Sequence, residues 1–220
     1  MKISLSTRLQ ACAAYVKNGD RIADIGCDHG YLSLYLLKNK IVSFAIAADV
    51  NEMPLQSAKL NAQKYGCSDR ISFHLSDGAQ NIPRDFDTMI CAGMGADTIV
   101  SILAASSWLK NSRYRLILQC QSKTPMLRNY LSDNGWHIVE EQVLRDGRFL
   151  YTVMNVQYDP QRPRLTDAQC HFPPALLVNP TKETHEYYEW IINGLKIQVQ
   201  HKEDPQITAI LNELTKENSP

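Results

Sequence analysis

The sequence predicts an α/β fold in which a doubly wound, mostly parallel sheet ends in an antiparallel hairpin. Short apolar runs alternate with helical stretches over the first 135 residues, which is the pattern of β-α-β units. Two long β-rich runs then flank Asp146-Gly147, a dipeptide typical of tight hairpin turns. A plain doubly wound sheet does not end in an antiparallel hairpin, so the expected fold class is narrower than the doubly wound folds as a whole.

The first half of the chain supplies the opening helix, two strand-helix units and a third strand. Leu5, Leu9, Cys12 and Val16 recur at helical spacing behind Ser4 or Ser6, either of which could cap a helix. Strands are expected at residues 21–26, 43–50 and 71–78, and helices at residues 31–38 and 51–66.

The second half continues the alternation and then changes. Further strands are expected at residues 86–95 and 114–120, and helices at residues 96–103 and from Pro125 to near Gly135. Residues 136–158 should form the hairpin. Residues 159–180 are rich in proline and poor in periodicity, which is typical of a linker.

Apolar residues return at helical spacing after Thr184, and again after Pro205, which predicts a small α-helical C-terminal extension. These two helices could pack on the sheet or form an arm that binds a partner, and periodicity does not separate the two. We expect one domain over residues 1–159, and a linker with the helical C-terminal element over residues 160–220.

Composition excludes several classes of protein. The 220 residues suffice for one substantial core, and their formal net charge of zero indicates no polyanion partner, so a nucleic-acid surface would have to be a local patch. No signal peptide is evident, and the apolar stretch at residues 41–50 is too short to cross a membrane, so we expect a cytoplasmic protein. The six cysteines include no C-x-x-C pair, so we expect no metal site.

Three acids stand at or just after the ends of successive predicted strands. Asp28 follows the first strand, Asp49 ends the second and Asp77 ends the third. In a doubly wound sheet, ligands bind across these carboxyl ends. Asp28 lies where a dinucleotide fingerprint would have its middle glycine, and a carboxylate there would repel a pyrophosphate.

The acids suit a nucleoside cofactor without phosphates. Asp49 could accept the ribose hydroxyls, and Asp77-Gly78 could meet the adenine amino group. Asp28, or the amides near Gly26 and Gly30, could bind an amino-acid tail. S-adenosylmethionine has these parts, and its sulfonium gains from a carboxylate-rich rim. Each acid taken alone could instead be a turn or cap residue.

Five segments resemble the bacterial tRNA (adenine-22-N1)-methyltransferase family. In order they are LSTRLQACAAYV, ADIGCDHGYL, DGA, AGMGADTI and RLILQCQS, and the similarity spans Ile3 to Tyr158. The later HFPPALL resembles the family's C-terminal region. The resemblance implies a Rossmann-like class I methyltransferase sheet with a helical extension, which uses S-adenosylmethionine to methylate adenine N1 in tRNA.

The resemblance also implies site residues. The expected cofactor-binding residues are the positions that match the family's cofactor motifs, the neighbouring Asp24 and Cys27, and Arg8 of the opening helix. The full set is Arg8, Asp24, Gly26, Cys27, Asp28, His29, Asp49, Val50, Asp77, Gly78, Ala92, Gly93 and Met94. His29 could bind the cofactor or a phosphate, or act only as a structural donor in the turn.

Methylation of adenine N1 needs positioning more than a nucleophilic side chain, because the ring nitrogen has its own lone pair. The expected catalytic residues are Asp28, which could stabilise the cationic ring or take the exocyclic proton, and Gln119 and Gln121, which could hold the base edge. The family commonly has Q-P-N where this chain has Gln119-Cys120-Gln121. That departure lies on the target side and leaves the substrate open.

A tRNA partner would need local cations. They occur in three groups, any of which could equally be a solvated face: Lys110, Arg113 and Arg115; Arg145 and Arg148; Arg162 and Arg164. Two other functions stay open, namely methylation of another RNA or a small molecule, and an inactive nucleoside-binding module. The sequence indicates no oligomeric state.

Overall fold

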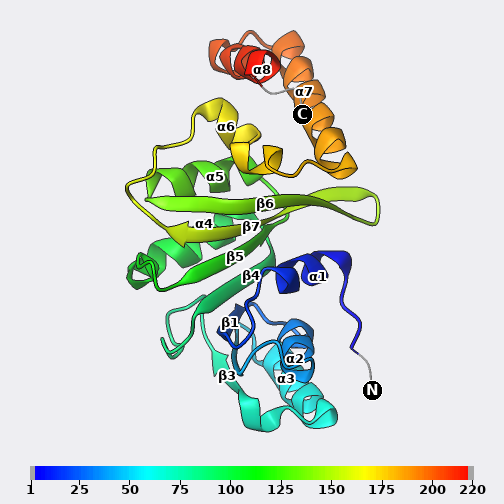
Figure 1. Ribbon diagram of the computed structural model, residues 1–220, viewed down its shortest axis with the longest axis vertical. Coiled ribbons are helices and arrows are strands. Elements are labelled where there is room, and N and C mark those ends of the chain that lie inside the picture. The colour runs from blue at the N-terminus through cyan, green and yellow to red at the C-terminus, as the bar shows by residue number, and fades with distance from the viewer. Residues whose placement is uncertain (1–2, 218–220) are drawn as a thin grey trace.

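The computed structural model describes residues 3–217 and shows one seven-stranded sheet in the order β3-β2-β1-β4-β5-β7-β6 (Figure 1). Strands β1 to β5 pair in parallel, and β7 runs antiparallel to both of its neighbours. The strands are β1 (Arg21–Ile25), β2 (Phe44–Asp49), β3 (Ile71–Leu75), β4 (Thr88–Met94), β5 (Arg115–Cys120), β6 (Trp136–Asp146) and β7 (Phe149–Tyr158). The predicted fold class is confirmed.

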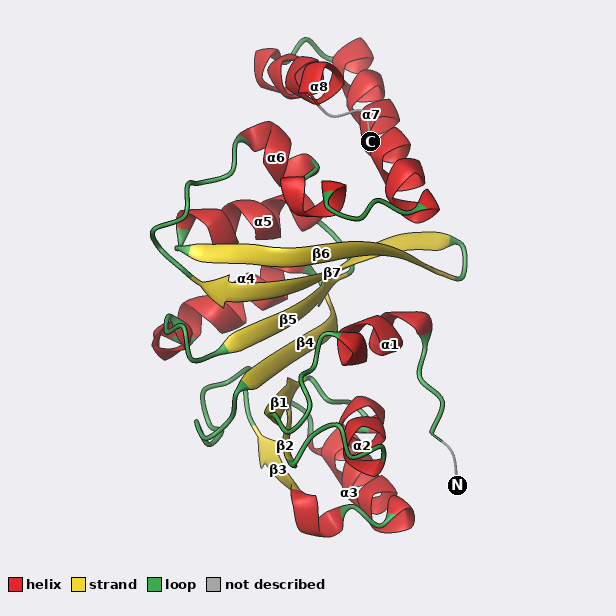
Figure 2. Cartoon of the chain, viewed as in Figure 1, coloured by secondary structure: helices red, strands yellow, loops and turns green. Residues whose placement is uncertain are grey.

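The helices lie on both faces of the sheet, as Figure 2 shows. They are α1 (Thr7–Ala14), α2 (Tyr31–Lys38), α3 (Glu52–Tyr65), α4 (Ala96–Ala105), α5 (Thr124–Asp133), α6 (Asp167–His171), α7 (Lys182–His201) and α8 (Pro205–Glu217). The first three share one apolar core with the sheet, and α4 and α5 share the core on the other face. Ser6 caps α1, since its hydroxyl accepts a hydrogen bond from the Leu9 amide.

The central strands are largely apolar because helices cover both of their faces. Ile22, Ala23 and Ile25 of β1 are each at most 2% exposed. The chain leaves β1 toward β2 on one side, and β4 later pairs with β1 on its other side. This reversal of strand order places a crevice at the carboxyl ends of β1 and β4, which is where an α/β sheet binds ligands.

The segment expected to be an irregular linker contains structure. The N-terminus of helix α6 has a capping box in which Thr166 and Gln169 exchange hydrogen bonds. Phe172, directly after the helix, is fully buried. Helices α7 and α8 then form a third apolar core with α6 and the outer face of the hairpin (Figure 1). Five helical residues are too few to produce a periodic pattern, so α6 could not be predicted from periodicity.

A buried ion pair joins this C-terminal element to the sheet domain. The Arg128 guanidinium of α5 binds both carboxylate oxygens of Glu141 on β6, at 2.6 and 3.2 Å, and both side chains are 0% exposed. The same guanidinium donates to the carbonyl oxygens of Cys170 and His171, at 3.0 and 2.8 Å. The boundary at residue 159 stays a prediction, and removing the later residues would leave Arg128 without two of its acceptors.

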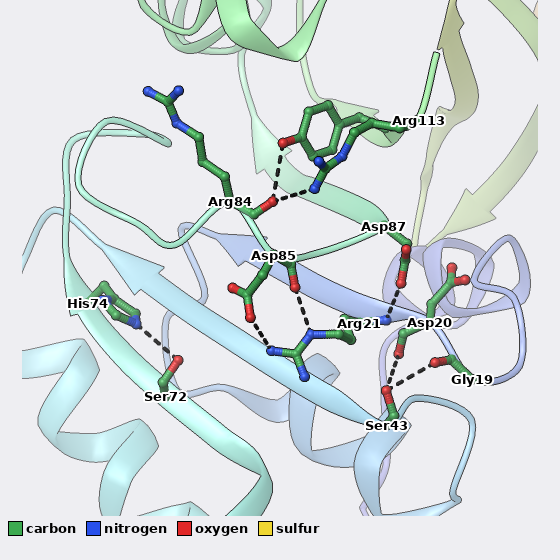
Figure 3. Close-up of polar contacts among 11 residues, drawn as sticks. Gly19, Asp20, Arg21, Ser43, Ser72, His74, Arg84, Asp85, Asp87 and Arg113 are labelled. Atoms are coloured by element: carbon green, nitrogen blue, oxygen red, sulfur yellow. Dashed lines mark hydrogen bonds and ion pairs between the residues drawn. The ribbon is translucent and has the colours of Figure 1, made fainter. Parts of the chain in front are cut away.

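At the edge where the strands begin, the polar groups bind one another (Figure 3). Arg21 pairs with Asp85 at 2.6 Å, its amide donates to Asp87 at 2.8 Å, and Arg113 donates to the Arg84 carbonyl oxygen at 2.8 Å. These contacts hold the loops before β4 and β5. They give this edge a structural role, and the glycine turns lie at the opposite edge.

Within residues 3–217, no helix has the length and apolar character needed to cross a membrane.

Candidate functional site

The turn after β1 is shaped by residues with positive φ. Gly26, Asp28 and Gly30 have φ values of 68°, 51° and 72°. A Cβ at Gly26 would lie 2.3 Å from the Met94 methyl carbon, so a larger residue would displace the Met94 side chain as well as strain the backbone at this positive φ. The amides of Gly26 and Cys27 donate to the Ala48 carbonyl oxygen at 2.8 and 3.0 Å. The turn is therefore fixed to the end of β2 and packed under the end of β4.

Asp24 is a buried acid at the centre of this site. It is 4% exposed, and its Oδ2 accepts a hydrogen bond of 2.7 Å from the Ser33 hydroxyl of α2. Burial raises the pKa of Asp24 to about 6, against the lowering effect of the Ser33 bonds, and the charge of Asp49 raises it further. Within residues 3–217 no lysine, arginine or histidine forms an ion pair with it. The site therefore fits a ligand that brings a positive charge, such as an ammonium.

Asp49 connects the first turn to the second strand. Its Oδ2 accepts from the Asp28 amide at 3.2 Å, and its Oδ1 accepts from the Asn51 amide at 2.9 Å. The side chain is 8% exposed, whereas the neighbouring Val50 is 63% exposed. Asp49 therefore holds the turn in place, and its two carboxylate oxygens keep lone pairs that these bonds do not use.

A β-bulge changes the direction of the chain at the end of β4. The register between β4 and β5 shifts between Ala92 and Met94, which leaves Gly93 as the extra residue with φ 82°. Gln119 of β5 is 1% exposed, its Oε1 accepts from the Gly93 amide at 2.9 Å, and its Nε2 donates to the Cys120 carbonyl oxygen at 2.9 Å. Gln119 therefore positions the bulge. These two bonds leave one Nε2 hydrogen and one Oε1 lone pair unused, and the expected contact of Gln119 with a base stays a prediction.

A cavity of about 370 Å³ lies between these features and α1. It brings together ten of the residues expected from the sequence: Arg8, Asp24, Gly26, Cys27, Asp28, His29, Ala92, Gly93, Gln119 and Gln121. Five expected residues are not part of its lining: Asp49, Val50, Asp77, Gly78 and Met94. Asp49 and Met94 act on the turn as described above.

Asp77 and Gly78 lie in the loop that follows β3, two and three residues beyond its end. Asp77 is exposed, and the Ser76 hydroxyl donates to the Gly78 carbonyl oxygen at 2.9 Å. Gly78 has φ 58°, and a Cβ there would approach Ile102 of α4 to 2.9 Å. The glycine lets this loop pack closely on α4 at the same edge of the sheet as the cavity.

The rim of the cavity is polar. Asp28 and His29 are exposed neighbours whose Oδ1 and Nε2 atoms lie 3.6 Å apart. Arg8 donates to Asp146 of the hairpin at 2.7 Å, and its guanidinium lies 5.0 Å from the centre of the Tyr151 ring. Arg8 therefore fastens α1 to the hairpin while it lines the cavity.

The sequence reasoning missed Ser33, which binds Asp24, and Ser6 and Leu9, which line the cavity beside Arg8. Ser33 looks like an ordinary helix residue, and only the packing of α2 against β1 brings it to Asp24. The structure brings together no group of three histidine, cysteine, aspartate or glutamate residues that could hold a metal ion within residues 3–217.

The expected cationic patch before β5 lies away from this site. Arg113 and Arg115 are at the edge where the strands begin, and Arg115 pairs with Asp20. Arg145 at the hairpin tip pairs with Glu186 of α7, and Arg162 and Arg164 pair with nearby aspartates. Arg113 and Arg115 thus lie at the edge of the sheet opposite the cavity, and Arg145, Arg162 and Arg164 are partly neutralised by their ion pairs.

Known proteins share this architecture. A family model described as "Methyltransferase domain" matches residues 5–154. The tRNA (adenine(22)-N(1))-methyltransferase of Bacillus subtilis (strain 168) is 35% identical over 154 residues, which cover 70% of this chain and 65% of that protein. The chain thus spans about two-thirds of the length of that relative.

Two solved structures match nearly the whole chain. The B. subtilis m1A22 tRNA methyltransferase TrmK is 28% identical, with a TM-score of 0.82 over 97% of this chain and 95% of that one. M. capricolum TrmK, solved with the cofactor product S-adenosyl-homocysteine, is 25% identical, with a TM-score of 0.80 over 96% and 95%. This chain belongs to the class I S-adenosylmethionine-dependent methyltransferases, in the TrmK family of tRNA m1A22 methyltransferases.

Proposed function

We propose that this protein transfers the methyl group of S-adenosylmethionine to N1 of an adenine in tRNA. The observation that supports methyl transfer is the buried Asp24 carboxylate, which opens into a cavity beside a glycine turn and lacks a cation of its own. The identity of the nucleic acid is supported by the relatives, which are described as tRNA methyltransferases. A tRNA substrate fits a cytoplasmic enzyme.

The residues present fit this cofactor. Asp24 would receive the ammonium of the amino-acid tail, with the turn amides near Gly26 and Gly30 beside it, and Asp49 would accept the ribose hydroxyls. Val50 and Asp77 would lie on the adenine side. When bound, S-adenosylmethionine supplies an electrophilic methyl group on a positively charged sulfur.

The target side is formed by the end of β4 and the start of the loop after β5. Gln119 holds the Gly93 bulge, which leaves room for a flat base, and Gln121 is exposed beside it with a free amide for the base edge. Met94 and Tyr31 supply apolar surface at the two sides of the turn. Holding the adenine with its N1 lone pair toward the methyl group supplies most of the acceleration.

The ring gains a positive charge on methylation, and a carboxylate near the rim can stabilise it. Asp28 is 71% exposed and adjoins the cavity, so its carboxylate can approach the methylated ring or accept its exocyclic proton. Asp49 accepts a hydrogen bond from the Asp28 amide, which fixes the backbone of Asp28 and leaves the Asp28 carboxylate available to the substrate.

A folded tRNA is much larger than the cavity, so a second surface is needed to select the base. The C-terminal helices α7 and α8 lie beyond the hairpin, and α7 adjoins the cavity edge that bears Gln121. We infer that they bind the tRNA body. Their cations are few, so binding should be moderate and should weaken with salt.

One observation favours a second candidate. Cys120-Gln121 stand where the resemblance leads us to expect other residues, and they lie on the target side, which favours a different RNA or a small molecule as substrate. Transfer of labelled methyl to unfractionated tRNA, to ribosomal RNA and to a metabolite mixture separates these candidates. We expect label in tRNA. Label only in the other fractions would contradict the proposal.

A further inference from the structure

A second cavity adjoins the first and has no assigned role. Its volume is about 320 Å³, and it lies between α7, the end of β5 and the start of β7. Gln121 lines both cavities, so the two are neighbours separated by one side chain. Anything that binds here lies beside a substrate held at the Gly93 bulge.

The wall of this cavity on α7 is an exposed aromatic platform. Trp190 is 67% exposed, although burial of a tryptophan normally stabilises a fold considerably. Its ring stacks on Tyr187, with 5.8 Å between ring centres and 22° between planes. Tyr187 is buried, and its ring centre lies 6.0 Å from the Arg128 guanidinium. One face of Trp190 is therefore supported by a fixed ring, while the side chain stays open to solvent.

Gly194 leaves room beside this platform. It lies four residues after Trp190, so the two share one face of α7. A Cβ added at Gly194 would have no neighbour within 4 Å. A glycine inside a helix lowers its stability relative to alanine, and no close packing in the structure requires it here. The open space is part of the cavity lining.

The floor of the cavity offers a polar group without a partner. Thr152 of β7 is 1% exposed, and its hydroxyl has no hydrogen-bond partner among the residues that the structure describes. His171 lines the same cavity, where burial and the Arg128 charge lower its pKa, so it is neutral at pH 7. Thr152 and His171 are uncharged polar groups beside an aromatic wall, and Lys123, which also lines the cavity, pairs with Asp97. This combination suits a flat heterocycle with hydrogen-bonding edges.

We propose that this cavity binds an unpaired nucleobase of the substrate RNA, next to the adenine that is methylated, and that the base stacks on Trp190. The proposal rests on the proposed function, because the occupant is argued from the adjoining target site. Proteins commonly hold unstacked RNA bases on aromatic side chains, with hydrogen bonds to the base edges. Binding two adjacent bases in two adjoining cavities would hold the RNA strand in an unstacked conformation and expose the target nitrogen.

Trp190 itself provides the first readout. Among the three tryptophans, Trp136 is buried and Trp108 half-buried, so Trp190 is the most exposed to solvent. Addition of tRNA, or of a short single-stranded RNA, should quench the tryptophan emission of the full chain. Trp190→Phe gives the background signal. An emission that neither RNA changes would overturn the proposal.

Variants supply the second readout. Trp190→Ala should raise the Kd for tRNA roughly ten-fold, and Trp190→Phe should restore most of the affinity, since stacking tolerates any aromatic ring. Gly194→Leu should weaken tRNA binding through steric exclusion without lowering the thermal stability, because leucine favours helix more than glycine does. Ile197→Ala, at a residue of α7 that is 54% exposed and outside the cavity, is the matched control. Affinity for S-adenosylmethionine should be the same in all four variants.

The outcomes separate this proposal from the proposed function. Unchanged tRNA affinity in both Trp190→Ala and Gly194→Leu, in an enzyme that methylates tRNA, overturns the second cavity and leaves the function intact. If the protein methylates a different RNA and that RNA quenches Trp190, the cavity proposal is supported and the choice of tRNA fails. Quenching by a peptide substrate and by no RNA overturns the nucleobase assignment.

Discussion

The buried carboxylate of Asp24 makes a quantitative prediction about stability and pH. Its pKa is about 6 in the folded protein, compared with an ordinary value of 3.8. The folded state therefore holds this proton more tightly than the unfolded state does. As pH rises from about 4 to about 6, the folded protein loses stability, by about 3 kcal/mol if each pKa unit is worth about 1.4 kcal/mol. Above pH 6 this contribution is constant.

Asp24→Asn removes the charge and tests the argument. At pH 8 we expect the variant to be more stable than the wild type by about 1 to 3 kcal/mol, and at pH 4 the two should be equal, because the wild-type carboxyl is then protonated. Urea unfolding at both pH values measures the difference. Asp69→Asn, at a side chain that is 78% exposed, is the control and should change neither value. Equal stabilities of the Asp24 variant and the wild type at pH 8 would refute the reasoning.

The same residue predicts how cofactor affinity varies with pH. A bound ammonium beside Asp24 favours the ionised carboxylate, so the Kd for S-adenosylmethionine should rise as pH falls below 6, by up to about ten-fold per pH unit. Asp24→Asn should bind more weakly at pH 8 and lose this dependence. Calorimetric titration at pH 5 and pH 8 gives both numbers. A wild-type Kd that does not change with pH would show that the ammonium binds elsewhere.

Four further variants test the remaining parts of the site. Arg128→Met should lower the free energy of unfolding by about 3 to 5 kcal/mol, because Glu141 is left buried and unpaired, and adding Glu141→Leu should recover most of this loss. A loss below about 1 kcal/mol in urea unfolding would contradict a buried ion pair. Asp49→Ala should weaken S-adenosylmethionine binding by about 1.5 to 3 kcal/mol in calorimetry, and binding of NAD in its place would overturn the cofactor assignment. Asp28→Asn should keep the native circular dichroism, since asparagine tolerates positive φ, and should lose methyl transfer; full activity would reduce Asp28 to a turn residue. Gln119→Leu should lower kcat and leave the Kd for the cofactor unchanged, whereas an equal effect on both would place Gln119 in the cofactor site.

Most of the fold could be predicted from the sequence because its signals are local. Helix α2 was expected at residues 31–38 and is observed at Tyr31–Lys38, and the hairpin turn was located by Asp146-Gly147. Helix α6 was missed, because five residues held by a capping box and one buried phenylalanine give no periodicity. Its position depends on Arg128, whose contacts are distant in sequence.

The site could be predicted only in part, for the same reason. Strand ends locate Asp28, Asp49 and Gly93, since the carboxyl ends of parallel strands meet at one edge, whereas the bulge at Gly93 is seen only in the structure. The partner of each polar atom depends on tertiary packing. Gln119 accepts a hydrogen bond from the Gly93 amide, a contact that no sequence pattern indicates, and its expected contact with a base stays a prediction. Arg8 binds Asp146, which lies 138 residues later in the chain.

The position of the methyl group on the product tests the central claim most directly. Unmodified tRNA is incubated with the full-length protein and labelled S-adenosylmethionine, then digested to nucleosides and analysed by mass spectrometry against N1-methyladenosine and N6-methyladenosine standards. The proposed function predicts that the label elutes as N1-methyladenosine and that reverse transcription stops at one adenine, because methylated N1 cannot pair. Label on N6, on another base or on the ribose would contradict it, as would a tRNA that remains unlabelled beside a labelled small molecule.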